Sequence, residues 1–435
     1  MKLAKISLAA AVALGALSTA SFAQPLEEAI KGVDVSGMLR YRYTDDRFKN
    51  TGNNSGDDNT DAKHSWRVNA DFKTPVVNNV AFNLGIVYNN SNNTNKGSGT
   101  EPGQGTEQFF GTGLGAGEDG KFGVATFYAT ITPSSTNTVI NVGKMRLDTP
   151  VTDALDDRGT GIIALNSDLP HWTFAGVALD TWALDDVNAP GTTSVTKGLY
   201  SVAALANYGD FNAQVWYFNV TDALKSLIFT ELSYKYDFFS IKGQYAYSDL
   251  ENGDSGLFGK NYLGAGNALP NKNALYTLEA GVSFAPVSAR VGYIGSDKDG
   301  YKVSFDNQGT YSMGGKIWND LSITGVNYSP VSEAPVAGEK RELEVFYGAV
   351  DVDVTDTLAL GLEYVKGENK ITDAAGSDKV KFQEITPTVT YQYSKNLTLS
   401  SYYAMLKVKN DSLKNNPGYA DAKQNELRFE ALYKF

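Results

Sequence analysis

Four arginines and an acidic segment are the side chains of this sequence best suited to act together as opposed fixed charges. Arg40, Arg42, Arg67 and Arg428 occur in stretches where polar and apolar residues alternate, whereas residues 147–158 contain four aspartates and no such alternation. Opposed charges of this kind, set across a narrow aqueous passage, would orient dipolar solutes and sort ions. The candidate residues are Arg40, Arg42, Arg67, Arg428, Asp148, Asp153, Asp156 and Asp157. Alternatively, the arginines pair locally, for instance Arg428 with Glu426 or Glu430, and sort nothing.

Catalytic chemistry has little support in the sequence. There is no cysteine, so a thiol nucleophile, a disulfide and a cysteine-bound zinc site are all impossible. A serine–histidine–acid site would need one of the two histidines, His64 or His171. Neither lies near a serine in a Gly-x-Ser-x-Gly setting. We therefore expect no enzymatic activity.

The elements that must position the charges have a period of two. In residues 426–435, apolar Leu427, Phe429, Ala431, Tyr433 and Phe435 alternate with residues that are charged apart from Leu432. Residues 33–43 and 66–72 follow the same pattern. An extended chain places such alternating sets on opposite faces. We expect the apolar face to contact lipid and the polar face to line water, as in the wall of a membrane-spanning barrel.

Short and long connections alternate between these predicted strands, as they do in outer-membrane barrels. Short turns are expected at residues 75–79, 133–137, 166–170, 208–210, 237–238, 286–287, 355–357 and 394–396. Long loops are expected at residues 45–62, 89–119, 180–197, 249–273, 296–340, 367–379 and 410–424. The fold class predicted is all-β: a single antiparallel transmembrane barrel of about 18 strands. By analogy with large barrels, its third loop, residues 147–158, is expected to fold into the lumen.

Composition and the amino-terminus indicate where the protein resides. Residues 1–23 contain two lysines, a short apolar run and Ser21-Phe22-Ala23, which predicts a cleaved signal peptide and a barrel domain of residues 24–435. The expected location is the outer membrane of a Gram-negative cell. The formal net charge of −11 argues against nucleic acid as a partner.

A family resemblance is visible at both ends of the predicted mature chain and near the third loop. Residues 25–43, Gly143-Lys144, Thr152-Asp153, residues 159–161 and the ending 431–435 resemble the Campylobacter-type major outer membrane porins. The resemblance implies an 18-stranded barrel, a homotrimer in the outer-membrane bilayer, and passage of small hydrophilic solutes without catalysis. It further implies that the carboxy-terminal strand is recognised by the barrel-assembly machinery.

The same resemblance suggests a calcium ion near the constriction. Asp156 or Asp157 matches the acid of the third loop, and Asp306 is the nearest match for a second acid. The alternative is that these acids are solvated loop charges. No other cofactor is expected.

The function expected from the sequence is a porin, a water-filled channel for passive diffusion of ions and small hydrophilic solutes, with a weak preference for cations. Two alternatives stay open. One is an adhesin or receptor that acts through long extracellular loops, and the other is a substrate-specific channel.

Overall fold

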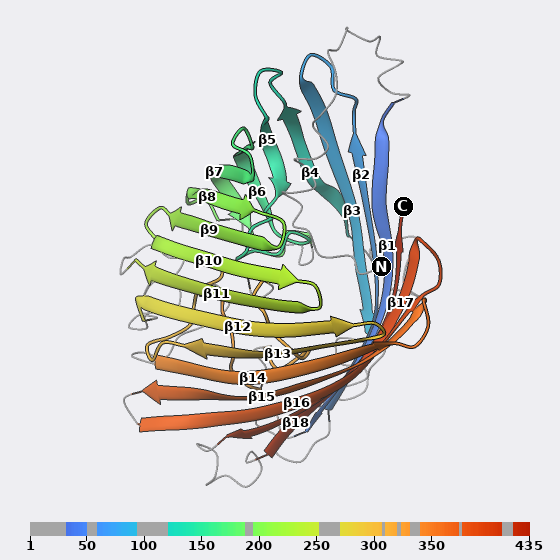
Figure 1. Cartoon of the computed structure of the whole chain (residues 1–435), viewed down its shortest axis with the longest axis vertical. Coiled ribbons are helices and arrows are strands. Elements are labelled where there is room, and N and C mark those ends of the chain that lie inside the picture. The colour runs from blue at the N-terminus through green and yellow to red at the C-terminus, as the bar shows by residue number, and fades with distance from the viewer. Residues whose placement is uncertain are drawn as a thin grey trace.

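The computed structural model describes residues 32–49, 59–93, 121–187, 195–251, 270–306, 309–319, 323–330, 340–373, 376–410 and 421–435. Their strands form one antiparallel sheet that closes on itself (Figure 1). The first nine strands are β1 (Asp34–Lys49), β2 (Asn59–Lys73), β3 (Val80–Asn93), β4 (Lys121–Ile131), β5 (Thr138–Arg146), β6 (Arg158–Asn166), β7 (Trp172–Ala183), β8 (Leu199–Asn207) and β9 (Phe211–Val220). The others are β10 (Leu224–Tyr236), β11 (Phe239–Leu250), β12 (Lys272–Phe284), β13 (Val287–Ser296), β14 (Lys340–Asp353), β15 (Leu358–Asp373), β16 (Gly376–Gln392), β17 (Leu397–Asn410) and β18 (Asp421–Lys434).

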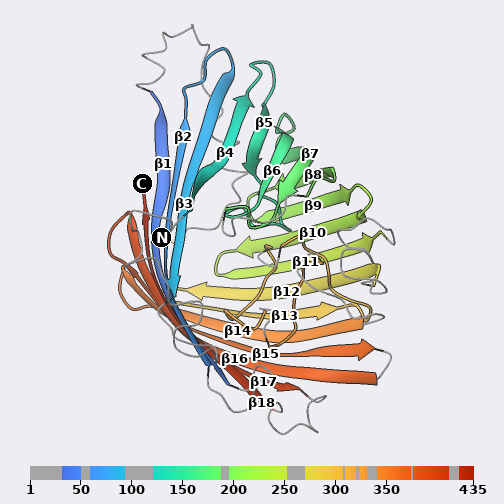
Figure 2. The ribbon, with the colours of Figure 1, turned by 180° about the vertical axis from the view of Figure 1, so that it is seen from behind.

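Closure of the sheet is made by β1 and β18. Met38 lies opposite Lys434, and the pairing runs without a break to Lys49 opposite Lys423. Both views accordingly show the blue first strand next to the red last strands (Figure 2). Closure gives the backbone N–H and C=O groups of both edge strands hydrogen-bond partners. A sheet in lipid needs such partners, because lipid chains cannot hydrogen-bond to an open edge. The predicted 18-stranded antiparallel barrel is therefore confirmed.

Alternation assigns the two faces of β1 and β2 as the sequence predicted. Val35 and Leu39 are 52% and 44% exposed on the outer face. Arg67 and Asn69 of β2 are buried on the inner face, at 1% and 4% exposure. The arginines of these strands therefore point into the barrel.

The short turns lie where the sequence placed them. Each of the eight predicted turns lies at the junction of two consecutive strands, although Asn166 still belongs to β6 and Val287 already belongs to β13. The predicted loop 367–379 is wrong, because β15 continues to Asp373 and β16 begins at Gly376. Polar residues continue these two strands past the apolar belt, so the alternation that marks a membrane strand fades before the strands end. Residues 1–23, the predicted signal peptide, lie outside the described residues.

The interior of the barrel is more apolar than predicted. Trp216, Phe218 and Val220 are on the inner face of β9, at 6%, 1% and 1% exposure, while Val215 and Tyr217 face outward. These inner residues belong to a hydrophobic cluster that also contains Phe305 and Tyr328 of the connection between β13 and β14. The expectation that apolar residues face lipid alone is wrong here, because part of the inner wall packs against chain.

That connection crosses the inside of the wall. Its tan trace runs over β11–β14 in both views (Figures 1 and 2). Tyr301, Val303, Phe305 and Trp318 are at most 1% exposed, although they belong to no strand. Burial of such large apolar side chains contributes about 1.5–3 kcal/mol each, which is enough to hold a connection without regular structure. Within the described ranges, no helix has the length and apolar content needed to cross a membrane.

Candidate functional site

Arginines and glutamates share the inner face where the barrel closes. Arg40 of β1 lies opposite Arg67 of β2, and Arg42 lies opposite Glu430 of β18. Arg428 is on the same face of β18, two residues before Glu430. The four predicted arginines are thus brought together on three neighbouring strands. The sequence predicted this grouping, because the first and last strands of a closed barrel become neighbours.

Two of these arginines pair along the wall. Nη2 of Arg42 lies 2.7 Å from Oε2 of Glu430 and Nε donates to the same oxygen at 2.9 Å. Nη2 of Arg428 lies 2.8 Å from Oε1 of Glu426, and its guanidinium stands 5.2 Å from the ring centre of Tyr402. Local pairing, the alternative that the sequence left open, therefore holds for Arg42 and Arg428.

Arg67 instead pairs with the acidic segment. Nη1 of Arg67 lies 2.5 Å from Oδ1 of Asp156, and Nη2 donates to the carbonyl of Leu155 at 3.0 Å. The Arg67–Asp156 contact is an ion pair whose angles are not those of a hydrogen bond. Both side chains are buried, so removal of one partner would leave an uncompensated charge, at a cost of about 3–5 kcal/mol.

Residues 147–157 hold their own shape through short-range hydrogen bonds. The hydroxyl of Thr152 donates to the carbonyl of Leu147 at 2.7 Å. The Asp157 carboxylate accepts from the backbone N–H of Asp153 at 2.8 Å and from that of Asp185 at 2.9 Å. This part of the chain is therefore compact, even though it lacks any strand or helix.

Arg158, which sequence reasoning missed, fixes the end of this segment. It is 1% exposed and donates to the backbone carbonyls of Ala125, Ala154, Leu155 and Asp157 at 2.7–3.3 Å. Because its N–H groups donate to these carbonyls, Arg158 joins β4 to residues 154–157. An arginine next to a run of acids gives no sign in sequence that carbonyls bind it.

Phe305, Asp306 and Thr310 of the β13–β14 connection contact the acidic segment through backbone hydrogen bonds. The N–H groups of Phe305 and Asp306 donate to the carbonyl of Val151 at 2.9 and 3.2 Å, and that of Thr310 donates to the carbonyl of Pro150 at 2.8 Å. Burial, together with the nearby charge of Asp306, raises the pKa of Asp157 to about 8. Two buried acids therefore face each other between the two connections.

A calcium ion can be tested against these acids. Asp157 and Asp306 fit, because a cation between them would relieve their repulsion, and Ca²⁺ accepts carboxylate and carbonyl oxygens together. Asp156 does not fit as well, since Arg67 already neutralises it. The described residues contain no group of three or more acidic or histidine side chains placed to hold a metal ion.

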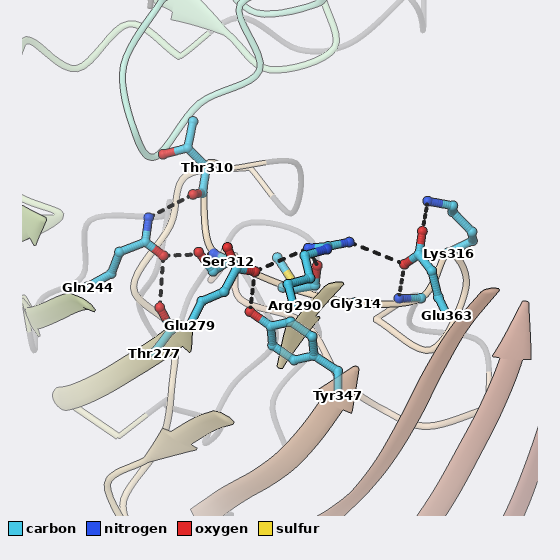
Figure 3. A network of polar contacts seen from close by, with 12 residues as sticks. Gln244, Thr277, Glu279, Arg290, Thr310, Ser312, Gly314, Lys316, Tyr347 and Glu363 are labelled. Carbon is cyan, nitrogen blue, oxygen red and sulfur yellow. Dashed lines mark hydrogen bonds and ion pairs between the residues drawn. The ribbon is translucent and has the colours of Figure 1, made fainter. Parts of the chain in front are cut away.

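Polar side chains of the wall hold the next part of the β13–β14 connection (Figure 3). Gln244 of β11 donates to the carbonyl of Thr310 at 2.9 Å and accepts from the N–H of Ser312 at 2.7 Å. The hydroxyl of Thr277 on β12 orients Gln244 by donating to the same amide oxygen at 2.9 Å. One side chain thus satisfies a carbonyl and an N–H of chain that has no strand partner.

Arg290 of β13 is the centre of the same network. It donates to the carbonyl of Met313 at 3.1 Å and pairs with Glu279 and Glu363 at 3.2 and 3.5 Å (Figure 3). The hydroxyl of Tyr347 donates to Glu279 at 2.8 Å. Opposite charges on β12, β13 and β15 therefore neutralise one another, while one guanidinium donor of Arg290 reaches the connection.

Two glutamates complete the hold on residues 315–318. Glu363 of β15 accepts from the N–H of Gly315 and from Nζ of Lys316, each at 2.7 Å. Glu384 of β16 is fully buried and accepts from the N–H groups of Lys316, Ile317 and Trp318 at 2.6, 3.1 and 2.8 Å. Glu384 follows the apolar Val380 and Phe382 on the inner face of β16, and an acid directly after this buried apolar pair is the signal that could have identified it.

A cavity of about 420 Å³ lies beside residues 145–152. Its lining includes the apolar side chains of Ile163, Leu165, Val177, Leu199, Trp216 and Phe218. The lining also includes Asp148, and Arg146 paired with Asp71 at 2.7 Å. Burial raises the pKa of Asp148, and Arg146 opposes that shift. Asp148 therefore lies apart from the Arg67–Asp156 pair and borders this cavity.

Asp153, the remaining predicted acid of this segment, accepts a hydrogen bond from the N–H of Leu155 at 2.7 Å, and burial raises its pKa.

The hydrogen-bond partners of the two histidines are a tyrosine hydroxyl and a backbone carbonyl, not a serine hydroxyl. Nδ1 of His64 lies 2.7 Å from the hydroxyl of Tyr41, in an aromatic group with Trp66. Nδ1 of His171 lies 3.0 Å from the carbonyl oxygen of Asn207 at a short turn. These contacts are those of side chains at the borders of a membrane belt.

Several solved structures share this architecture. OccK9 (OpdG) of Pseudomonas aeruginosa superposes with a TM-score of 0.61 at 14% identity, over 94% of this chain and 100% of its own. OccAB3 of Acinetobacter baumannii gives 0.60 at 13%, over 92% and 100%. OpdK of P. aeruginosa, solved with vanillate, gives 0.58 at 12%, over 92% and 99%. Identities this low establish the fold alone.

Sequence comparison is more specific. No curated protein matches the chain. The family model described as Campylobacter major outer membrane protein matches residues 1–435, the whole length. On a closed 18-stranded barrel with the fold of outer-membrane channels, that match means that the protein belongs to the Campylobacter major outer membrane protein family.

Proposed function

We propose that this outer-membrane barrel is a porin that lets ions and small hydrophilic solutes diffuse passively, with a weak preference for cations. The observation that carries the proposal is the Arg67–Asp156 pair, which joins the inner wall at the barrel closure to residues 147–157. We infer that these residues lie across the lumen as the third loop and narrow it. Arg40, Arg42 and Arg428 then form the basic side of the constriction.

We base the cation preference on the net charge of −11 and on the four aspartates of residues 147–158. Arg42, Arg67 and Arg428 are each neutralised by a carboxylate, so Arg40 is the one of the four arginines without an ion pair among the described residues. Opposing it, Asp148 has only the nearby Arg146, which already pairs with Asp71. An excess of carboxylate over guanidinium lowers the energy of a cation on the path more than that of an anion.

Reconstitution into planar bilayers tests the proposal. We expect stable, step-like openings and a reversal potential in a KCl gradient that is displaced modestly toward the value for K⁺. A closed lumen would refute the porin and favour an adhesin or receptor. Current that a single solute class blocks saturably would favour a substrate-specific channel, which is the second candidate because the cavity is lined by both apolar and charged side chains.

Calcium is proposed as a structural ligand of the connections. Asp157 and Asp306 would hold it, and the ion would supply positive charge that links residues 147–157 to residues 304–310. Asp156 would remain with Arg67. Equilibrium binding of calcium to the detergent-solubilised protein, with Asp306→Asn as the comparison, tests the assignment.

The remaining proposals concern export and assembly. We propose that cleavage after Ala23 releases residues 24–435, which sequencing of the mature amino-terminus checks. We also propose a homotrimer, which light scattering of the purified protein in detergent checks. Recognition of the carboxy-terminal strand by the barrel-assembly machinery is tested by deletion of Phe435, whose backbone pairs with Gly37 of β1. Catalysis is not part of the proposed function.

A further inference from the structure

Lysine side chains form a row across the outer face of five neighbouring strands. Lys366 of β15 lies opposite Gln383 of β16, which lies opposite Lys407 of β17. Lys407 lies opposite Lys423 of β18, and Lys423 lies opposite Lys49 of β1. With neighbouring strands about 4.8 Å apart, the row spans about 20 Å of the wall. All four lysines are exposed.

A second row adds two lysines nearer to the rim. Lys381 of β16 lies opposite Lys409 of β17, and both are exposed. Phe382 and Val408, which alternate with them, are at most 3% exposed and belong to the internal hydrophobic cluster. The lysines therefore point away from the lumen. We call the set the lysine band: Lys49, Lys366, Lys381, Lys407, Lys409 and Lys423.

The band borders the apolar belt of the barrel. On the same outer face, nearer to the short turns, the exposed residues are Tyr364, Ile385, Tyr403 and Leu427. The band itself lies toward the end that carries the β17–β18 and β1–β2 connections. In a membrane-spanning barrel, charged residues just past the belt are at the depth of lipid headgroups.

Like charges lie directly opposite one another within the band. Lys407 faces Lys423, Lys423 faces Lys49, and Lys381 faces Lys409, and like charges directly opposite on adjacent strands destabilise a sheet. The chain as a whole carries −11, so the excess of lysine is local. Glu344 and Glu368 share the face, and Glu368 already pairs with Lys379.

The side chains also enclose a hollow in the wall. It measures about 710 Å³ and is bordered by Lys366, Lys381, Lys407, Lys409 and Phe346, among others. Lys366, Lys407 and Lys409 make no hydrogen bond or ion pair with other residues of the described ranges. An anionic group in this hollow would contact several ammonium groups at once, and lysine binds phosphate as a point charge.

We propose that the lysine band binds the phosphorylated headgroup of an outer-leaflet lipid, with its acyl chains against the apolar residues beside the band. The orientation rests on the proposed function, since it takes the long connections as extracellular. A second copy of this chain is the competing occupant. It is disfavoured because two copies of the band repel each other, and lipid phosphate matches both the charge and the depth.

Native mass spectrometry of the detergent-solubilised full chain tests the proposal with lipid A as probe. We expect lipid A carrying two phosphates to bind, and the phosphate-free form to bind at least tenfold more weakly. The triple variant K407Q/K409Q/K423Q should lose about tenfold to a hundredfold in affinity, because each lysine near an anionic lipid surface contributes about 1 kcal/mol.

Two further variants make the test specific. K235Q/K395Q/K434Q removes the same charge from exposed lysines at the opposite end and should bind like the wild type. K407R/K409R/K423R keeps the charge and should also bind. Equal binding of the glutamine variant, or of phosphate-free lipid, would overturn the proposal. So would a changed oligomeric state with unchanged lipid binding, which would make the band a subunit contact. Conductance measured on the same proteins reports on the proposed channel separately.

Discussion

Substitution of Glu384 by Gln should release the β13–β14 connection from the barrel wall. The Glu384 carboxylate is fully buried and accepts three consecutive N–H groups, from residues 316–318, together with the hydroxyl of Thr386 at 2.6 Å. An amide has one acceptor oxygen, and its NH₂ group would face N–H donors. Hydrogen bonds to charged groups contribute about 1.5–3 kcal/mol each, so three give an upper bound of about 9 kcal/mol.

The expected loss is smaller than this bound. The remaining oxygen keeps part of the interaction, and water entering the gap can satisfy some N–H groups, so we expect about 3–5 kcal/mol of local stability to be lost. Since 1.4 kcal/mol is a factor of ten, amide hydrogen exchange at residues 315–318 should accelerate at least a hundredfold. Single-channel conductance should rise or fluctuate as the connection leaves the wall.

Glu344→Gln is the matched control. Glu344 is on the outer face of β14 and exposed, so the same change in charge leaves the network intact. If E384Q and E344Q exchanged at the same rate at residues 315–318, the carboxylate would not be what holds the connection, and our reasoning would be refuted. Thermal unfolding of both variants shows whether the barrel itself is unchanged.

Three further predictions concern the acids of residues 147–157 and their partners. Asp156→Asn should leave Arg67 without a counter-charge, destabilise this segment by about 3–5 kcal/mol and raise the noise of the open-channel current; wild-type noise would contradict the ion-pair argument. Burial raises the pKa of Asp148, so Asp148 should lose its charge at a higher pH than an exposed aspartate, which titrates near pH 4. As the pH is lowered, the cation preference measured by reversal potentials should therefore begin to fall before that pH is reached. Asp148→Asn should abolish this part of the pH dependence. The same raised pKa means that stability from Asp148 is complete below its unfolded pKa and declines as pH rises through the folded one. Calcium chelation should accelerate hydrogen exchange at residues 147–157 in the wild type but leave the Asp157→Asn/Asp306→Asn double variant unchanged; an equal response in both would exclude this site.

Local sequence determined the strands because a strand in a membrane wall is recognisable from its own residues. Val35 and Leu39 alternate with polar neighbours, and that alternation alone places them on the outer face. Turns such as residues 237–238 follow from the breaks between alternating stretches. These signals need no knowledge of the rest of the chain, since each strand meets lipid on one side whatever its partners are.

The strand pattern was least informative where the inner face is apolar. Trp216 and Phe218 interrupt the simple rule that apolar residues face lipid, because described residues of the β13–β14 connection, such as Phe305, pack in the same cluster on the inner face. A connection that packs inside the barrel has the same composition as one that extends from it. Only the wall residues that receive it, such as Glu384 and Gln244, distinguish the two, and they come from distant strands.

The charged site shows the same division. Sequence alone selected Arg40, Arg42, Arg67 and Arg428 as inward-facing, and the register confirms that they share one face. Which of them would pair along the wall and which would reach Asp156 was decided by tertiary structure. Pairing depends on distances of a few ångströms between strands that closure brings together from opposite ends of the chain, and a period of two carries no information about such distances.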